Sequence, residues 1–260
     1  MTRSMPVQYG RSPAQTADLY LPDTNTLAPV VCLLHGGFWR VPHGRDQFDA
    51  IATDLRARGY AVWNIGYRRL GEASGGWPGT MEDVAAAIDH LAALRDQGHR
   101  LDLERVAVVG HSAGGQLALT TAARASHPAT AITPSRVRPR AVCAQAGLCD
   151  LEQAFAMDAG RGAVREFLGG TPEEFPERYR DVSPVRRLAL DARVLLLHGL
   201  DDDAVPVAMS RGYAAAAQTA GSAVELVELP ATGHMELLEP SSEAHTRLCE
   251  WLERSALQAP

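Results

Sequence analysis

Seven short runs of apolar residues alternate with longer segments of helical period, and this alternation constrains the fold more than any other feature of the sequence. The predicted strands are Thr16–Leu21, Val30–Leu34, Ala61–Ile65, Val106–Val109, Ala141–Ala146, Val194–Leu197 and Val224–Leu229. Most are apolar throughout, which is typical of strands covered on both faces of a parallel sheet. The first alternates polar and apolar residues, so we expect an edge strand in a hairpin. The order of elements indicates an α/β fold with a mostly parallel central sheet flanked by helices.

Four helices are predicted between or after these strands. Thr80, with Asp83 three residues later, is typical of a helix that starts with a capping box. Residues 113–125 are rich in helix-forming residues and follow the preceding strand without a break. Pro206 and Pro240 are expected to open the last two helices, because proline is favoured in the first turn.

The length of 260 residues fits one domain, since α/β folds often reach this size as a single unit. The interval 150–188 breaks the alternation, because short helical signals are mixed there with glycine and proline. It would follow a strand at the carboxyl edge of the sheet, where ligands bind in open α/β folds. We therefore expect residues 1–260 to form one domain that carries a small lid at 150–188.

Charge and composition disfavour several classes of partner. The net charge of -6 disfavours nucleic acid and anionic membranes, which both favour a basic face. No segment approaches the ~20 apolar residues that would cross a bilayer, and the first residues lack the apolar run of a signal peptide. The four cysteines are far apart without a Cys-x-x-Cys pair, so a cytoplasmic protein with reduced thiols is expected, and neither a metal nor an organic cofactor is implied. Cys149 is kept as a candidate reactive thiol because it lies near the predicted active site.

A serine in a glycine-rich turn is the strongest chemical signal. Ser112 is the centre of Gly110-His111-Ser112-Ala113-Gly114, a G-x-S-x-G motif between an apolar run and an alanine-rich helix. The chain has to pass from strand to helix within a few residues, which strains the serine and exposes it above the helix N-terminus. The pattern predicts Ser112 as a nucleophile. The alternative is a glycine-rich turn that only connects two elements.

A second glycine-rich turn, His35-Gly36-Gly37-Phe38-Trp39, follows an earlier predicted strand. Acyl transfer passes through an oxyanion that needs backbone N–H donors fixed in advance. We expect the amides of Gly37, Phe38 and Ala113 to supply these donors. His35 is interpreted as a residue that braces the loop.

The two motifs together resemble those of the α/β-hydrolase superfamily. The H-G-G-x-W pattern of residues 35–39 is similar to that of small carboxylesterases and kynurenine formamidase-like arylformamidases, which are related to hormone-sensitive-lipase-like esterases. The resemblance extends from Asp18-Leu19-Tyr20-Leu21-Pro22 to His234. Phe38 stands where the lipase-like branch has a third glycine, which favours the formamidase-like or general esterase side. The resemblance implies the α/β-hydrolase fold and a serine hydrolase that forms an acyl-enzyme.

The catalytic base is expected after the serine, since the superfamily order is serine, acid, histidine. His234 is favoured because it lies in a glycine-containing loop directly after the predicted strand Val224–Leu229. His198 ends another predicted strand and is a rival candidate for the base. However, His-Gly pairs at such a position more often brace the loop that carries the catalytic acid, here called the acid loop (residues 200–206).

For the acid, the resemblance indicates Asp202, because the superfamily pattern H-G-x-x-D-x-x-V-P matches residues 198–206. Asp201 and Asp203 flank this position, so each of them is an alternative candidate for the acid. Asp150, at the end of another predicted strand, is a further candidate.

Bulky side chains near these loops are candidates for substrate contact. They are Trp39, His111, Phe155 and Met157, with Trp77 as a further candidate. Such a wall favours a small apolar or aromatic substrate. We expect a serine hydrolase that cleaves a small carboxylic ester, with an arylformamidase or another amide hydrolase as the alternative and a non-enzymatic ligand receptor as a third hypothesis. A homodimer is compatible with the sequence.

Overall fold

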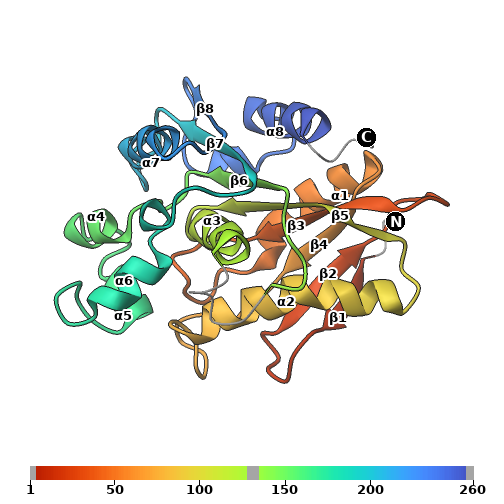
Figure 1. Cartoon of the computed structure of the whole chain (residues 1–260), viewed down its shortest axis with the longest axis horizontal. Coiled ribbons are helices and arrows are strands. Elements are labelled where there is room, and N and C mark those ends of the chain that lie inside the picture. Colours follow the sequence, from red (N-terminus) through yellow and green to blue (C-terminus); the bar gives the residue numbers. More distant parts are fainter. Residues whose placement is uncertain (1–3, 128–134, 256–260) are drawn as a thin grey trace.

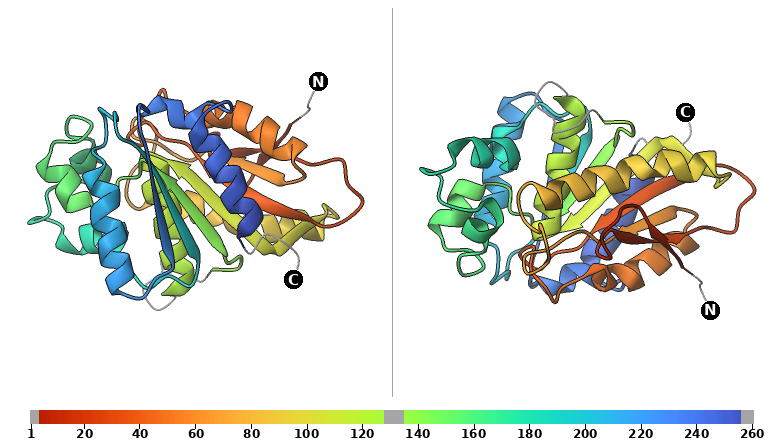
Figure 2. Two further views of the ribbon diagram at one scale, coloured as in Figure 1. Left: turned by 90° about the horizontal axis from the view of Figure 1, so that it is seen from above. Right: turned by 90° about the horizontal axis from the view of Figure 1, so that it is seen from below.

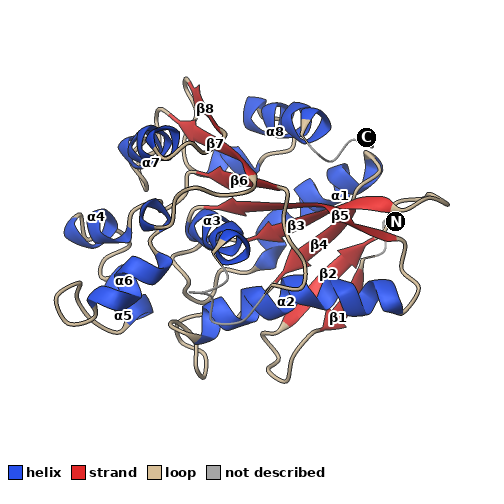
Figure 3. Ribbon diagram, in the orientation of Figure 1, coloured by secondary structure: helices blue, strands red, loops and turns tan. Residues whose placement is uncertain are grey.

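The computed structural model describes residues 4–127 and 135–255, and one sheet runs through them. Its strands are β1 (Met5–Gln8), β2 (Thr16–Tyr20), β3 (Ala28–Leu34), β4 (Ala61–Ile65), β5 (Leu101–His111), β6 (Ala141–Gln145), β7 (Arg193–Gly199) and β8 (Val224–Leu229). They are arranged in the order β1-β2-β4-β3-β5-β6-β7-β8 (Figures 1 and 3). Strands β3 to β8 are parallel to one another, whereas β2 is antiparallel to both of its neighbours, β1 and β4. All seven predicted strands are present.

The N-terminal edge of the sheet differs from the prediction. Strand β2 forms the expected hairpin but is not the edge, because β1 pairs with it, with Val7 opposite Ala17. Strand β1 has only four residues, and most of these residues are exposed. It therefore lacks the apolar run from which the other strands were predicted. Strand β5 begins at Leu101, earlier than predicted, because Leu101 already pairs with Ala28 of β3.

Helices cover both faces of the sheet (Figure 2). On one face lie α1 (Asp49–Ala57) and α8 (Glu243–Arg254), and on the other lie α2 (Gly79–Asp96), α3 (Ala113–Ser126) and α7 (Ala208–Thr219). Along β3, Cys32 and Leu34 pack in one core cluster while Val31 and Leu33 pack in the other. This double coverage explains why the parallel strands are apolar throughout. No helix in the described part of the chain has both the length and the apolar character needed to cross a membrane.

The start of α2 corrects a prediction. Thr80 does not cap this helix, because its hydroxyl donates to the carbonyl oxygen of Arg68 at 2.6 Å. Asp83 is fully buried and accepts hydrogen bonds from Arg68 instead of reaching back to the helix start. The last two helices begin at Ala208 and Glu243, slightly after the prolines that were expected to open them.

The interval 150–188 forms short helices between β6 and β7. They are α4 (Leu151–Ala156), α5 (Ala163–Leu168), α6 (Pro176–Val182) and the 3-10 helix η3 (Pro184–Arg186). Helices α4, α5 and α6 are grouped at one end of the molecule (Figure 1). Phe167 of α5 stacks on Trp39, which follows β3, so this 150–188 segment packs on a loop at the carboxyl edge of the sheet.

Candidate active site

The predicted nucleophile lies in a sharp turn between β5 and α3. Ser112 has φ 56° and ψ -119°, a conformation that L-residues rarely adopt, and it is 2% exposed. A Cβ at Gly110 would overlap the carbonyl oxygen of Gly114, and a Cβ at Gly114 would overlap that of Leu34. Only glycine therefore fits at the two ends of the G-x-S-x-G motif.

Two neighbouring elements hold this turn. The amide of Ser112 donates to the carbonyl oxygen of Gln145 at the end of β6, at 2.8 Å. A Cβ at Gly36 would lie 3.0 Å from Cβ of Ser112 and 3.0 Å from the carbonyl oxygen of His111. The structure thus brings the two glycine-rich turns of the sequence into direct contact.

The predicted base and acid form a hydrogen-bonded pair. Nδ1 of His234 lies 2.7 Å from Oδ2 of Asp202. The Asp202 side chain has no exposed surface, whereas that of His234 is 11% exposed. Oδ1 of Asp202 accepts hydrogen bonds from the amides of Ala204 and Val205 at 2.9 and 2.8 Å. These amides fix the carboxylate, and the carboxylate orients the imidazole.

The surroundings of Asp202 keep its carboxyl ionised. Burial acts to raise its pKa, but hydrogen bonds from His198, His234 and the Val205 amide outweigh burial and hold the pKa well below the ordinary value of 3.8. The charged form is therefore available to stabilise a protonated imidazole at His234.

The rival histidine braces the acid loop. His198 is fully buried, with Nδ1 2.7 Å from Oγ of Ser210 and Nε2 2.8 Å from the carbonyl oxygen of Val205. Because a carbonyl oxygen only accepts, Nε2 carries a proton, and Nδ1 is occupied by the hydrogen bond with the Ser210 hydroxyl. These contacts leave His198 without a free nitrogen for general base catalysis.

The three other aspartates considered for the catalytic acid lie in environments that differ from that of Asp202. Asp201 and Asp203 are exposed, and neither side chain forms a hydrogen bond with His234 among the residues that the structure describes. Asp150 is the N-cap of α4, since its carboxylate accepts from the amides of Glu152 and Gln153. Geometry therefore favours Asp202.

The histidine next to the nucleophile supports the loop of the predicted base. Nε2 of His111 lies 3.0 Å from the carbonyl oxygen of His234, and the two rings are 4.5 Å apart. Burial and the nearby His234 lower the pKa of His111 to about 3, so its ring is neutral near neutral pH and donates from Nε2. His111 is 1% exposed. The sequence suggested that His111 contacts the substrate. In the structure its ring is instead hydrogen-bonded to the backbone carbonyl oxygen of His234.

In the described residues, no hydrogen bond joins the Ser112 hydroxyl to the His234 imidazole. In free enzymes such contacts are often long and tighten only when substrate binds. The bond from His111, the residue adjacent to Ser112, keeps the His234 loop beside the serine turn.

A substitution at His111 distinguishes a positioning role from substrate contact. His111→Ala should lower kcat on p-nitrophenyl acetate by about tenfold with little change in KM, because the base loses its support. His111→Gln, whose amide can donate to the same carbonyl oxygen, should recover part of kcat. A higher KM with an unchanged kcat would instead assign the ring to substrate binding.

The loop after β3 contains two of the three residues predicted as oxyanion donors. Gly37 has φ 96° and Phe38 has φ 49°. Among the described residues, the amides of Gly37 and Phe38 donate to no protein acceptor. Ala113 is the first residue of α3, where amides have no intrahelical partner. These three amides have no protein acceptor among the described residues, so they remain the candidates for an oxyanion site.

Trp39 differs from its prediction as a substrate-binding residue. Its side chain is fully buried, stacks on Phe167 at 4.2 Å, and donates from Nε1 to Oε1 of Gln116 at 3.2 Å. Trp39 therefore anchors the loop after β3 to the 150–188 segment. His35 has the bracing role that we expected, since its buried ring stacks on Tyr67.

The two remaining candidates lie in the 150–188 segment. Met157 is 46% exposed and borders a cavity of about 270 Å³ that is also lined by Ala204 and Val205 of the acid loop. Phe155 is partly buried, packs edge-on against Tyr179, and borders a separate hollow. Of the two, only Met157 adjoins the acid loop.

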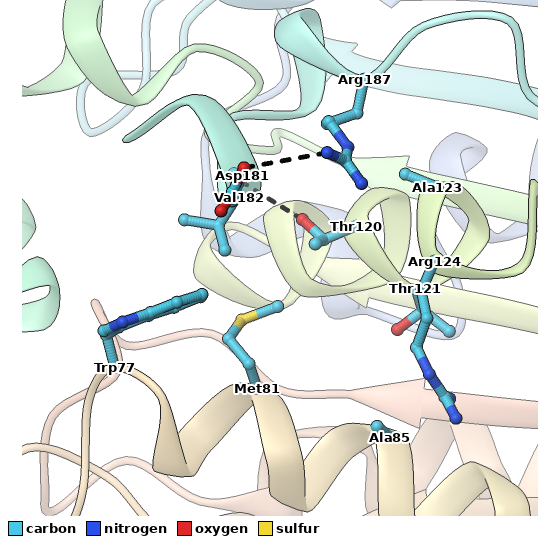
Figure 4. Close-up of a pocket in the computed structure, with 10 residues that line it drawn as sticks. All are labelled: Trp77, Met81, Ala85, Thr120, Thr121, Ala123, Arg124, Asp181, Val182 and Arg187. Atoms are coloured by element: carbon cyan, nitrogen blue, oxygen red, sulfur yellow. Dashed lines mark hydrogen bonds and ion pairs between the residues drawn. The ribbon is translucent and has the colours of Figure 1, made fainter. Parts of the chain in front are cut away.

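Trp77 lies elsewhere. It lines a cavity of about 60 Å³ between α2, the C-terminal half of α3 and the end of α6. Figure 4 shows Trp77 and Met81 across this cavity from Thr120 and Val182. Thr120 is eight residues beyond Ser112, or about 12 Å along the helix. The suggestion that Trp77 contacts substrate is therefore not supported.

Cysteines and possible metal ligands lie apart from the serine. Cys149 is fully buried, and burial raises its pKa to about 12, which disfavours a reactive thiolate. Asp54, His245 and Cys249 bring possible metal-binding atoms within 4.8 Å of one another. The sequence gave no sign of this group, because Asp54 is remote in the chain. Asp54 already accepts from Nε of Arg58 at 2.6 Å and lies 2.7 Å from Nε2 of His245, so hydrogen bonds within the protein account for these contacts of Asp54.

Arg40 was not predicted as a functional residue. It follows the H-G-G-F-W motif directly, and its guanidinium contacts the carbonyl oxygens of Gly160 and Arg161 and the carboxylate of Glu166. Only its position next to the motif could have pointed to Arg40 in the sequence, because the residues that it contacts are more than a hundred positions away along the chain.

Comparisons with known proteins show what this chain is similar to. A family model described as BD-FAE matches residues 17–216. Esterase LipC of Mycobacterium tuberculosis is 30% identical over 268 residues, which cover 97% of this chain and 66% of LipC. Kynurenine formamidase of Meyerozyma guilliermondii is 31% identical over 120 residues, which cover 46% of this chain and 42% of that protein. The chain spans about half to two thirds of the first curated relatives that it matches.

A solved structure supports the fold. The truncated form of a carbohydrate esterase from gut microbiota has a TM-score of 0.81 at 20% identity, over 97% of this chain and 95% of that one. The α/β-hydrolase fold predicted from the sequence is thereby confirmed. The family match runs from β2 to α7 and includes both glycine-rich turns and the acid loop. This chain therefore belongs to the BD-FAE family, within the α/β-hydrolase superfamily.

Proposed function

We propose that this protein is a serine hydrolase that cleaves a carboxylic ester of a small molecule. The observation that carries the proposal is the His234–Asp202 hydrogen bond, held beside a strained serine turn. The similarity to esterases such as LipC supports the ester as the substrate class.

In the proposed mechanism, His234 accepts the proton of the Ser112 hydroxyl while the oxygen attacks the ester carbonyl. Asp202 holds the imidazole in the correct tautomer and stabilises the imidazolium. The amides of Gly37, Phe38 and Ala113 stabilise the oxyanion. His234 then gives the proton to the leaving alcohol, and the C–O bond breaks to leave an acyl group on Ser112. His234 then takes a proton from a water molecule that attacks this acyl group, and it gives that proton to Oγ of Ser112 as the bond between Oγ and the acyl carbon breaks and the acid is released.

An amide substrate is the second candidate. The same constellation can cleave a formamide, and the partial similarity to a kynurenine formamidase favours an N-formylated aromatic amine over other amides. A non-enzymatic receptor is disfavoured because serine, imidazole and carboxylate are all present with ordered support.

Labelling and a substrate panel test the proposal together. A fluorophosphonate probe should label one serine, which peptide mapping should identify as Ser112. Hydrolysis of p-nitrophenyl acetate should exceed that of N-formylaniline and N-formylkynurenine. Faster cleavage of the formamides would select the second candidate, and an enzyme that neither reacts with the probe nor cleaves any of these compounds would contradict both.

A further inference from the structure

Gln145 is the last residue of β6 and is fully buried. In the sheet it is aligned with His111, the last residue of β5. Side chains alternate along a strand, so Gln145 points to the same face of the sheet as Cys143. That face is covered by α1 and α8, and the aligned position of His111 places its side chain there too.

Gln145 contacts both the serine turn and the segment that follows the predicted base. Its backbone carbonyl oxygen accepts from the amide of Ser112 at 2.8 Å, and its side-chain Nε2 donates to the carbonyl oxygen of Leu237 at 3.1 Å. Leu237 belongs to the 3-10 helix η4 (Met235–Leu238), whose N-cap is His234. One residue therefore joins the backbone of the nucleophile to the helix that begins at the base.

Stability alone does not explain the contact between Gln145 and Leu237. Oε1 of Gln145 is buried and has no hydrogen-bond partner among the residues that the structure describes. An unpaired buried oxygen costs free energy, and each such group in a folded protein calls for an explanation. An apolar side chain of the same size would remove this unpaired oxygen but would leave the oxygen of Leu237 unpaired, so the exchange is close to neutral for stability. The amide therefore contributes mainly a fixed position for η4.

We propose that Gln145 is a positioning residue that holds the His234 imidazole at its working distance from the Ser112 hydroxyl. The inference rests on the proposed function, in which protons pass between these two groups during both acylation and deacylation. Among the described residues the two side chains form no hydrogen bond with each other, so their separation depends on the contacts that join the two backbones.

His111 and Gln145 hold the His234 loop at two points. His111 donates to the carbonyl oxygen of His234, at the start of η4, and Gln145 donates to that of Leu237, near its end. The Leu237 side chain is fully buried and packs in a small cluster with Ala146, the residue after Gln145. A single hydrogen bond would let η4 pivot, whereas two bonds to the ends of neighbouring strands also fix its direction.

Gln145→Met is the direct test. Methionine has a similar volume and keeps the backbone carbonyl that binds Ser112, but it cannot donate to Leu237. We expect kcat on p-nitrophenyl acetate to fall by about tenfold, because a small displacement of the base slows each proton transfer. KM should change little, since His234 serves acylation and deacylation alike. The melting temperature should stay within about 4 °C of the wild type.

Labelling by the fluorophosphonate gives a readout that does not depend on the ester. Its second-order rate constant should fall by the same factor as kcat, because phosphonylation of Ser112 needs the same proton transfer to His234. Gln218→Met, at an exposed position of α7, is the matched control and should leave both rates unchanged. A higher KM with an unchanged kcat and labelling rate in Gln145→Met would assign this side chain to substrate binding and overturn the inference.

Gln145→Glu tests the hydrogen-bond donor itself. The carboxyl of this variant can donate to the carbonyl oxygen of Leu237 only while it is protonated, and its ionised form repels that oxygen. Because burial raises the pKa of a carboxyl group, the ratio of wild-type to variant kcat should rise by about fivefold from about pH 6 to pH 9. Taking the ratio at each pH removes the pH dependence that both proteins share. His111 stays neutral throughout, since its pKa is about 3. A ratio that is constant or falls with pH would contradict the role of the donor.

These outcomes separate the inference from the proposed function. If Ser112 reacts with the probe but Gln145→Met retains full kcat, the positioning role is wrong and the serine hydrolase stands. If Gln145→Met melts far below the wild type and Gln145→Glu shows no pH-dependent ratio, Gln145 serves only the fold and the inference is overturned. If the wild-type protein neither reacts with the probe nor cleaves any ester, the proposed function fails and the inference fails with it.

Discussion

Ser112→Ala should reduce kcat on p-nitrophenyl acetate by about 10⁵-fold and should abolish labelling by the fluorophosphonate. The expected loss is large because the hydroxyl is the group that forms the acyl-enzyme, and the remaining residues cannot replace it. The residual rate would come from the oxyanion donors and from substrate binding.

Stability provides the control for this variant. Ser112 is strained in the turn, and alanine adopts the same backbone with a side chain that is no larger, so the melting temperature should stay close to that of the wild type. Ser241→Ala, at an exposed position, should retain full activity. Substantial turnover by Ser112→Ala with unchanged kcat/KM would remove this serine from the mechanism.

Asp202→Asn should lower kcat by about 10⁴-fold. An asparagine amide can preserve the packing, but its NH₂ group favours the wrong tautomer of His234, and the amide carries no charge to stabilise an imidazolium. Asp201→Asn is the matched control, because it removes one carboxylate from the same loop at an exposed position. Its kcat should stay within about twofold of wild type. A comparable loss in both variants would point to the charge of the loop as a whole.

The same substitution has a pH-dependent effect on stability. Because the pKa of Asp202 is lower in the folded protein than its ordinary value of 3.8, the ionised carboxyl stabilises the fold above that value. This contribution is lost as the pH falls through the lower folded pKa. The difference in unfolding free energy between wild type and Asp202→Asn should therefore have its full size above about pH 5 and should decrease below about pH 4. A difference that grows in acid would contradict the assigned direction.

Local patterns were sufficient for much of the fold and for part of the site. The parallel strands could be predicted because both of their faces are covered, which makes them apolar throughout. The serine turn could be predicted because strand, glycines and helix are adjacent in the chain. Strand β1 carried no such pattern, since most of its residues are exposed and its partner alone defines it.

Side-chain environment was harder to predict than position. Trp39 and Trp77 both belong to loops in the sequence, but Trp39 is fully buried against Phe167 and Trp77 lines the small cavity between α2, α3 and α6. Thr80 has the sequence of a helix cap, yet its hydroxyl bonds to Arg68. Arg40 acts on carbonyl oxygens far along the chain. Each outcome depends on tertiary contacts that a short stretch of sequence does not encode.

The consecutive positions of His111 and Ser112 have a mechanical consequence. Thermal motion at the end of β5 displaces both residues together, and the bond from His111 to the carbonyl oxygen of His234 transmits that displacement to the loop opposite. The serine turn and the backbone of the loop that carries the imidazole are therefore joined by one hydrogen bond and are not supported independently.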